Sequence, residues 1–302
     1  MNDKREQLPF VSIIAPIYNM EDSIENLIIS LLNQDYPKER LEIIIVDNNS
    51  TDNSKAIAEK FPILVFEEKK IQGSYAARNL GIKNAKGSIL AFIDSDCKAN
   101  KSWVREGVKK LRVRQIDLVG GKVEFYYSKR ITPAELLDSL ANMRNKVNII
   151  GQNVAKTANL FVRKRVFDEI GLFPSYLKSG GDVVWTKRAS QDGYLLIYAS
   201  RAIVHHPARN LIQLLRKQYR VARGVGRELF QDKLSLFSII LNMGFTLFPS
   251  NFSLFKESVY INGSIQMRKR VFAMWVVELV INFSSFLGKL SSLRKTRKRG
   301  KK

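Results

Sequence analysis

Short apolar runs alternate with amphipathic stretches along the first hundred residues of the chain. Residues 10–18, 41–46, 63–66 and 89–94 are apolar runs of strand length, and the stretches between them show helical spacing or capping signals. Four strands alternating with three helices are typical of βαβ units, whose strands pair in parallel and are buried on both faces. The pattern predicts an α/β fold with a mostly parallel central sheet flanked by helices.

The alternation becomes less regular after residue 96, although segments of both kinds continue. We expect helices over residues 103–113, 134–147, a short stretch ending at 171, and 182–189, and strands over 118–126, 157–162 and 194–203. We therefore assign residues 1–210 to one α/β domain.

The pattern changes again from residue 211. Residues 211–230 read as a basic amphipathic helix, and residues 234–255 and 271–288 are apolar. The first apolar segment is just long enough to cross a bilayer, but asparagine, glycine, proline and serines dilute it. If both apolar segments crossed the membrane, the four basic residues within 256–270 would lie on its outer side, against the positive-inside tendency. A hairpin lying in or partly entering the cytoplasmic leaflet fits better, and core helices of a second soluble domain stay open as an alternative.

Charge is concentrated in this second region, residues 211–302. The chain carries a formal charge of +22, and residues 210–302 hold 18 basic against 4 acidic residues. Such an excess favours an anionic surface, either nucleic acid or a membrane. The basic residues flank apolar segments and end in the polybasic tail 294–302, so we expect an anionic membrane and no nucleic acid. One cysteine and a charged N-terminus without a signal peptide place the catalytic part in a reducing cytoplasm.

Two carboxylates, Asp94 and Asp96, follow the apolar run at 89–94. Carboxylates at the end of a parallel strand face the crevice in which open α/β sheets bind ligands. Oxygen ligands suit Mg²⁺ or Mn²⁺, which are commonly held by one or two carboxylates together with substrate phosphates. The alternative is an Asx turn in which these side chains only satisfy backbone amides.

Several motifs occur in the order found in one known family. They are residues 11–19, residues 46–52, Gly73 with residues 77–82, Asp94-Ser95-Asp96, and Gly180-Gly181-Asp182. Together, residues 10 to about 207 resemble a family 2 glycosyltransferase of the Rossmann-like GT-A fold. The resemblance implies a nucleotide-sugar donor, UDP- or GDP-linked, bound by Pro16, Tyr18, Asn19, Asp47, Asn48, Gly73, Arg78, Asp94 and Asp96.

The resemblance also implies the metal and the acceptor sides of the site. Asp96 would be the principal ligand of Mn²⁺ or Mg²⁺, Asp94 would hold the ribose or a metal-bound water, and His205 would complete the metal ligands. The acceptor side would include Gly120, Gly121, Asn159 and Gly181.

Asp182 corresponds to the family's catalytic base, commonly preceded by Glu, whereas Gly181 precedes it here. A carboxylate near the acceptor hydroxyl takes its proton during the attack, which gives inversion in one displacement. A helix N-cap is a second role for Asp182, compatible with the first.

The expected function is an inverting, metal-dependent glycosyltransferase on the cytoplasmic face of the cell membrane. It would transfer a sugar to a membrane-linked acceptor in the synthesis of a cell-surface polysaccharide or glycolipid, and no protein partner is predicted. A catalytically inactive scaffold that binds membranes is the alternative. A nucleotidyltransferase is disfavoured because no glycine-rich, lysine-bearing loop follows the first strand at residues 16–20.

Overall fold

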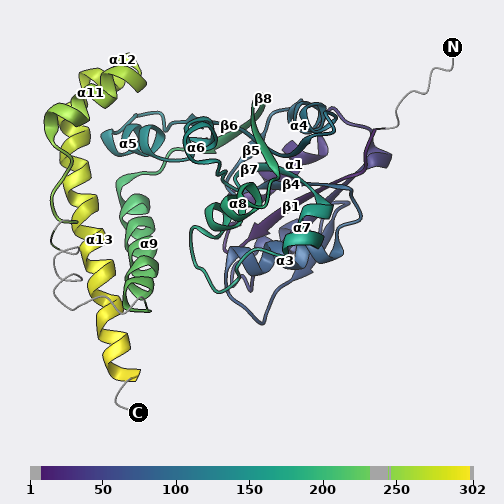
Figure 1. Cartoon of the computed structure of the whole chain (residues 1–302), viewed down its shortest axis with the longest axis horizontal. Helices are drawn as coiled ribbons and strands as arrows, with labels where there is room; N and C mark the ends of the chain where they lie inside the picture. Colours follow the sequence, from purple (N-terminus) through teal and green to yellow (C-terminus); the bar gives the residue numbers. More distant parts are fainter. Residues whose placement is uncertain (1–7, 232–243, 245, 300–302) are drawn as a thin grey trace. The chain divides into compact units, whose positions relative to one another are not determined.

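The chain forms two compact units in the computed structural model, which describes residues 8–231, 244 and 246–299 (Figure 1). The first unit comprises Met1–Phe125 and Met143–Pro207, and the second comprises Tyr126–Asn142 and Ala208–Lys302. The segment Tyr126–Asn142, which the sequence-based division left in the α/β domain, is therefore part of the second unit.

One eight-stranded sheet organises the first unit, in the order β3-β2-β1-β4-β7-β6-β8-β5. Strands β1 to β4 are mutually parallel where they pair, whereas β7 is antiparallel to both β4 and β6, and β5 is antiparallel to β8. The predicted α/β fold is confirmed, with a parallel half and a mixed half. The strands are β1 Val11–Ile17, β2 Leu41–Asp47, β3 Leu64–Glu67, β4 Ile89–Ile93, β5 Lys98–Ala99, β6 Ile116–Tyr126, β7 Asn159–Arg163 and β8 Leu195–Pro207.

Helices cover both faces of this sheet, as the apolar strand runs require. Successive β1 residues point to opposite faces, so Ile13 joins a core cluster with α1 and α4, and Ile14 joins another with α3, α7 and α8. The helices of this unit are α1 Ile24–Leu32, α2 Ser54–Ala58, α3 Ser74–Asn84, α4 Trp103–Leu111, α6 Asn145–Gln152, α7 Lys164–Ile170 and α8 Gly181–Gln191, with a 3₁₀ turn at Lys38–Arg40.

The single helix predicted over residues 134–147 is wrong, because the segment forms two helices. Helix α5, Pro133–Ala141, begins in a capping box formed by Thr132 and Glu135, and α6 begins at Asn145. Between them Met143 has a φ of 52°, in the left-handed region, which no α-helix accommodates. The apolar periodicity continues through the break, so the pattern alone did not reveal it.

The second unit is helical, and the helices predicted over residues 211–230 and 271–288 are present. Leu136, Leu214, Val259 and Met274 belong to its core, one from each of four helices. Residues 232–243 and 245, which include about half of the predicted apolar segment 234–255, lie outside the described residues. The helices of this unit are α5, α9 Leu211–Gln231, α11 Phe252–Asn262, α12 Ile265–Lys269 and α13 Val271–Arg299.

Candidate active site

The carboxyl ends of β1, β2 and β4 meet at one edge of the sheet. Ile17 at the end of β1 is in register with Asp47 at the end of β2, and Asp94 follows β4 directly. In open α/β sheets ligands bind outside this edge. The predicted polar residues of the three strand ends are therefore brought to a common place.

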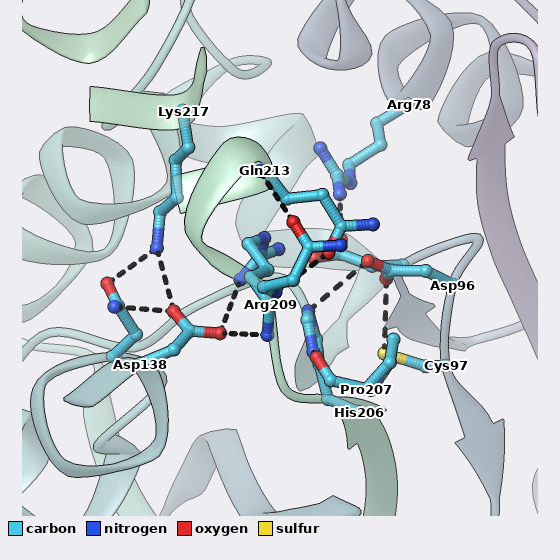
Figure 2. A network of polar contacts seen from close by, with 12 residues as sticks. Arg78, Asp96, Cys97, Asp138, His206, Pro207, Arg209, Gln213 and Lys217 are labelled. Carbon is cyan, nitrogen blue, oxygen red and sulfur yellow. Dashed lines mark hydrogen bonds and ion pairs between the residues drawn. The ribbon is translucent and has the colours of Figure 1, made fainter. Parts of the chain in front are cut away.

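Asp96, Cys97 and His206 form a group, here called the Asp96 cluster, whose potential ligand atoms lie within 4.8 Å of one another (Figure 2). The Oδ2 atom of Asp96 is 3.4 Å from Nε2 of the fully buried His206. The Nδ1 atom of His206 lies 2.6 Å from the carbonyl oxygen of Pro207 and must carry a hydrogen, because a carbonyl only accepts. With that tautomer, Nε2 turns its lone pair toward the Asp96 carboxylate, so that both atoms are suited to bind one cation.

The chemistry of the Asp96 cluster fits a hard divalent cation. Burial raises the pKa of the Cys97 thiol well above its usual value, and the charges of Asp96 and Asp94 raise it further. Cys97 therefore remains a thiol, and the ligands on offer are a carboxylate oxygen and an imidazole nitrogen. These suit Mn²⁺ or Mg²⁺ better than a thiophilic metal.

Asp94 forms an ion pair with the buried Arg78 of α3. Burial raises the pKa of Asp94, while the Arg78 guanidinium opposes that rise. The Nε–H of Arg78 is buried and has no hydrogen-bond partner among the described residues. An unsatisfied donor of this kind is costly unless a ligand accepts its hydrogen, and phosphate oxygens are suited to guanidinium groups.

Asp182, Tyr75 and Thr157 form a second group, here called the Asp182 cluster. Asp182 lies in the first turn of α8 and is nearly buried. Its Oδ1 accepts from the Tyr75 hydroxyl at 3.0 Å and from the Val183 amide at 2.9 Å, and its Oδ2 accepts from the Thr157 amide at 3.1 Å. Neutral donors thus fix the carboxylate without neutralising its charge.

Tyr75 also explains why glycine precedes Asp182. A Cβ atom at Gly181 would lie 2.8 Å from Cε2 of the Tyr75 ring, which is closer than real Cβ contacts. Burial raises the pKa of Tyr75 well above its usual value, and the charge of Asp182 adds to the rise, so the phenol stays a donor. The ring therefore occupies the space that a side chain at position 181 would need.

The Asp182 cluster is linked to Asp94 through α3. The guanidinium carbon of Arg78 lies 5.6 Å from the centroid of the Tyr75 ring, within the range of a cation–π contact. Arg78 pairs with Asp94, and Tyr75 hydrogen-bonds to Asp182. One turn of helix thus holds both carboxylates, so the two belong to a single site.

The side chains predicted to bind the donor are divided between free and fixed groups. Asp47 is buried; its Oδ2 accepts from two loop amides, and its Oδ1 has no partner among the described residues. The amide of Asn48 is instead fully engaged, donating to the carbonyls of Glu68 and Ile71 and accepting from the Gly73 amide. Asn48 therefore shapes the loop that begins α3.

The end of β1 carries the remaining predicted donor residues. Pro16 is buried within β1, and Tyr18, just beyond it, is half exposed. Asn19 accepts from the Thr51 amide at 2.8 Å, which fastens this end to the loop after β2. Of these three, Tyr18 has the surface available for stacking on a base.

The structure brings His206, and not His205, beside Asp96. His205 is half-buried, and its Nδ1 atom lies 3.7 Å from Oε2 of Glu124. Neighbouring strand residues face opposite sides, and His206 shares its side with the buried Ala202 and Val204. Ile203 and Val204, which precede the histidines on opposite sides of the strand, are both apolar, so the sequence did not show which histidine points inward. Tyr75 and Thr157 were also missed, and no local motif marks them.

The predicted acceptor residue Asn159 is fully buried and its amide is saturated. Its Oδ1 accepts from the Trp103 indole at 2.8 Å, and its Nδ2 donates to the carbonyls of Lys122 and Ala202. Gly121 packs against this amide so closely that a Cβ would lie 2.3 Å from Oδ1, and a Cβ at Gly120 would lie 2.5 Å from Ile149. These contacts give all three residues a packing role.

A separate cavity of 580 Å³ lies in the first unit, beside the start of β1, and includes none of the predicted site residues. It is lined by Leu8, Gln34, Asp35, Tyr36, Pro37, Arg105, Val108, Lys109 and Arg112.

Comparison with known proteins gives consistent matches. Residues 12–170 match the family model "Glycosyl transferase family 2". The glycosyltransferase AglE of Haloferax volcanii is 47% identical over 236 residues, covering 76% of this chain and 77% of AglE. A poly(ribitol-phosphate) beta-glucosyltransferase of Bacillus spizizenii is 30% identical over 59% of this chain, which spans only 29% of that relative.

Solved structures resemble the fold over nearly the whole chain. The mannosyltransferase PcManGT of Pyrobaculum calidifontis, in complex with GDP-Man and Mn²⁺, has a TM-score of 0.62 at 19% identity and covers 94% of this chain and 87% of its own. Staphylococcus aureus TarS, in complex with UDP, has a TM-score of 0.54 at 20% identity and covers 95% and 92%. At these identities the likeness shows the fold.

Proposed function

The chain belongs to the glycosyl transferase family 2, and from this premise we propose that it is an inverting, metal-dependent enzyme that moves a sugar from a nucleotide donor to a membrane-linked acceptor. The observation that carries the proposal is the arrangement on α3, where Tyr75 holds Asp182 and Arg78 holds Asp94. This arrangement gives one site both a base and a metal-binding motif.

The donor would lie across the carboxyl ends of β1, β2 and β4. Tyr18 offers a ring to the base, and the unsatisfied Oδ1 of Asp47 offers an acceptor to its edge or to the ribose. Arg78, through its unsatisfied Nε–H, would bind a phosphate oxygen. GDP-Man, UDP and UDP-GlcNAc in related folds support a UDP- or GDP-linked sugar as the donor.

Asp96 and His206 would hold Mn²⁺ or Mg²⁺, with Asp94 oriented beside them by Arg78. When bound, the ion stabilises the negative charge that develops on the departing diphosphate. The Mn²⁺ in PcManGT supports this assignment.

Asp182 would act as the base. An acceptor hydroxyl attacks the anomeric carbon, the bond from that carbon to the phosphate oxygen breaks, and the hydroxyl proton passes to Asp182. General base catalysis of this kind contributes about 10² to 10⁴-fold in rate. Tyr75 and the amides of Thr157 and Val183 would keep this carboxylate in one orientation. A single displacement in which the hydroxyl attacks opposite the departing diphosphate inverts the anomeric carbon.

The second unit would hold the enzyme on the cytoplasmic face of the cell membrane, near an acceptor of a cell-surface polysaccharide or glycolipid. Val271–Ser291 is long and apolar enough to cross a membrane, with a mean hydropathy of 1.7 and 17% of it buried. The excess of basic residues after position 210 supports contact with anionic lipid.

The test is nucleotide release by the purified full-length protein in detergent, over a panel of UDP and GDP sugars with Mn²⁺ or Mg²⁺. We expect release from one donor class, lost with EDTA, abolished in Asp96→Ala and reduced about 10³-fold in Asp182→Asn. Asp168→Asn, an exposed position on α7, is the matched control and should retain full activity. Release that persists in EDTA would refute the metal assignment, and no release from any donor would refute the enzyme.

A further inference from the structure

Helix α13 has two opposite apolar faces, and the other described residues of the unit cover only one of them. Met274, Ile281, Ser285 and Gly288 face inward and are buried. On the opposite face lies what we call the outer stripe, spaced three or four residues apart and extending about 22 Å along the helix. The outer stripe consists of Phe272, Val276, Val280, Phe283 and Leu287, each between 39% and 64% exposed.

Helix α9 packs along the inner face of α13 (Figure 1). The backbones approach so closely that a Cβ on Gly288 would lie 2.5 Å from the carbonyl oxygen of Tyr219, and the Ser284 hydroxyl donates to the Leu215 carbonyl at 2.9 Å. Apolar side chains of both helices share one core. The two helices therefore form one tightly packed pair.

Helix α9 is itself anchored within the same unit by a buried carboxylate. Asp138 of α5 is fully buried and accepts from the Arg209 amide at 2.9 Å, with the Lys217 ammonium 3.7 Å away (Figure 2). Removing a partner of a buried carboxylate is strongly destabilising, so α9 does not leave this position readily.

This packing bears on whether α13 crosses the membrane. Length and hydropathy allow a crossing, since Val271–Ser291 spans about 31 Å. A crossing would, however, carry the paired α9 into the hydrocarbon together with its exposed Arg216 and Arg220. Arginines facing lipid at that depth are rare because the cost of burying their charge is high.

We infer that α13 lies along the membrane surface instead of spanning it, with its outer stripe inserted into an anionic phospholipid leaflet and α9 on the aqueous side. This inference rests on the proposed membrane association and specifies its geometry. Charge complementarity selects the lipid: the exposed Arg268 and Lys269 of α12 directly precede α13, and residues 294–302 hold seven basic residues in nine.

The first test is the side of the membrane on which the chain ends. In everted sealed membrane vesicles from expressing cells, a membrane-impermeant maleimide would be applied to Ile212→Cys on α9 and to a cysteine added after Lys302. A flat α13 predicts that both are labelled from outside, whereas a crossing predicts labelling of the C-terminal cysteine only after detergent. Wild type supplies the background from the buried Cys97. Labelling of the C-terminal cysteine only after detergent would overturn the flat arrangement, while membrane association itself would still hold.

The second test addresses the outer stripe itself. Full-length protein would be floated with vesicles of phosphatidylglycerol and phosphatidylcholine, and with phosphatidylcholine alone. Val280→Ser with Phe283→Ser should weaken partition into the anionic vesicles at least tenfold, since two inserted side chains are lost. Val147→Ser with Ile150→Ser, an equally spaced exposed pair on α6, should change it less than twofold.

Each remaining outcome is informative. An equal loss of vesicle binding in both double variants would overturn the inference. Tight binding to the neutral vesicles without binding to the anionic ones would also overturn it. If sedimentation without vesicles shows a dimer that only Val280→Ser with Phe283→Ser dissociates, a second copy of the chain covers the stripe and the inference fails. If circular dichroism shows that this double variant is unfolded, Phe272→Ser replaces it, with Ile150→Ser as its control. Nucleotide release in detergent tests the enzyme independently of both experiments.

Discussion

The Asp96 cluster and the Asp182 cluster contain the same kind of acid but satisfy it differently. Neutral donors hold both oxygens of Asp182, whereas Asp96 faces the imidazole nitrogen of His206 at 3.4 Å. The Asp182 cluster is complete without a ligand, because each hydrogen bond has a donor and an acceptor. In the Asp96 cluster, the carboxylate and Nε2 of His206 are two potential ligand atoms that a cation between them would engage together. The difference supports the two roles that we propose, with Asp182 accepting a proton and Asp96 binding a cation.

The largest effect should come from removing the imidazole of His206 from the Asp96 cluster. We expect His206→Ala to lower nucleotide release about 10³-fold, or about 4 kcal/mol in transition-state stabilisation, because the proposed metal ligand is lost. His205→Ala should stay within about twofold, since His205 faces Glu124. Initial rates across a Mn²⁺ titration measure both. Equal losses in the two variants would contradict the assignment of His206.

The next largest effect should be a loss of stability on replacing Asn159, which lies beside the strand end that precedes the Asp96 cluster. Asn159 is in register with Ile93, which directly precedes Asp94, so it supports the strand end that carries the motif. Asn159→Ala should lower the free energy of unfolding by about 3 kcal/mol, because the Trp103 indole and two carbonyls lose their partner. Urea unfolding followed by tryptophan fluorescence measures this. The exposed Asn84→Ala is the control and should change stability by about 0.5 kcal/mol or less. A stable Asn159→Ala protein with a raised acceptor KM would restore the acceptor role.

The sequence predicted the parallel half of the fold and the two acidic motifs because local signals determine them. Buried apolar runs set β1, β2 and β4, and Asp94, Asp96 and Asp182 follow strand ends or a glycine turn. The break between α5 and α6 was missed, because Met143 adopts its left-handed conformation inside a continuous apolar pattern.

Contacts between distant residues were not accessible in the same way. Tyr75 and Asp182 are 107 positions apart, and a tyrosine on a helix gives no sign of its partner. Asn159 shows the limit of a local signal: a polar residue in a strand suggests a ligand contact, and in the structure three internal groups saturate its amide, so its acceptor role stays a prediction. His205 and His206 were equally hard to separate, because Ile203 and Val204 are both apolar and only the structure shows that His206 is the buried one.

A smaller effect should follow from weakening the Asp182 cluster. Tyr75→Phe removes one hydrogen bond to Asp182 and keeps the ring beside Gly181 and Arg78. We expect kcat to fall about tenfold, near 1.4 kcal/mol, with the donor KM within about twofold, because the base is less well oriented and the donor contacts remain. Steady-state kinetics with Tyr176→Phe, an exposed tyrosine, as the control measure this. A change confined to KM would place Tyr75 on the donor side.

The smallest effect should come from removing the Thr157 hydroxyl, which lies beside Oδ2 of Asp182. The Thr157 hydroxyl lies 3.4 Å from Oδ2 of Asp182, whereas the Thr157 amide lies at 3.1 Å and is retained in Thr157→Val. A long hydrogen bond contributes little, so kcat should fall only about two- to threefold, or about 0.5 kcal/mol. Comparing Tyr75→Phe, Thr157→Val and the double variant shows whether the two donors act independently. A loss in Thr157→Val as large as in Tyr75→Phe would mean that the Thr157 hydroxyl fixes Oδ2 of Asp182. The assignment of that role to the Thr157 backbone amide would then be wrong.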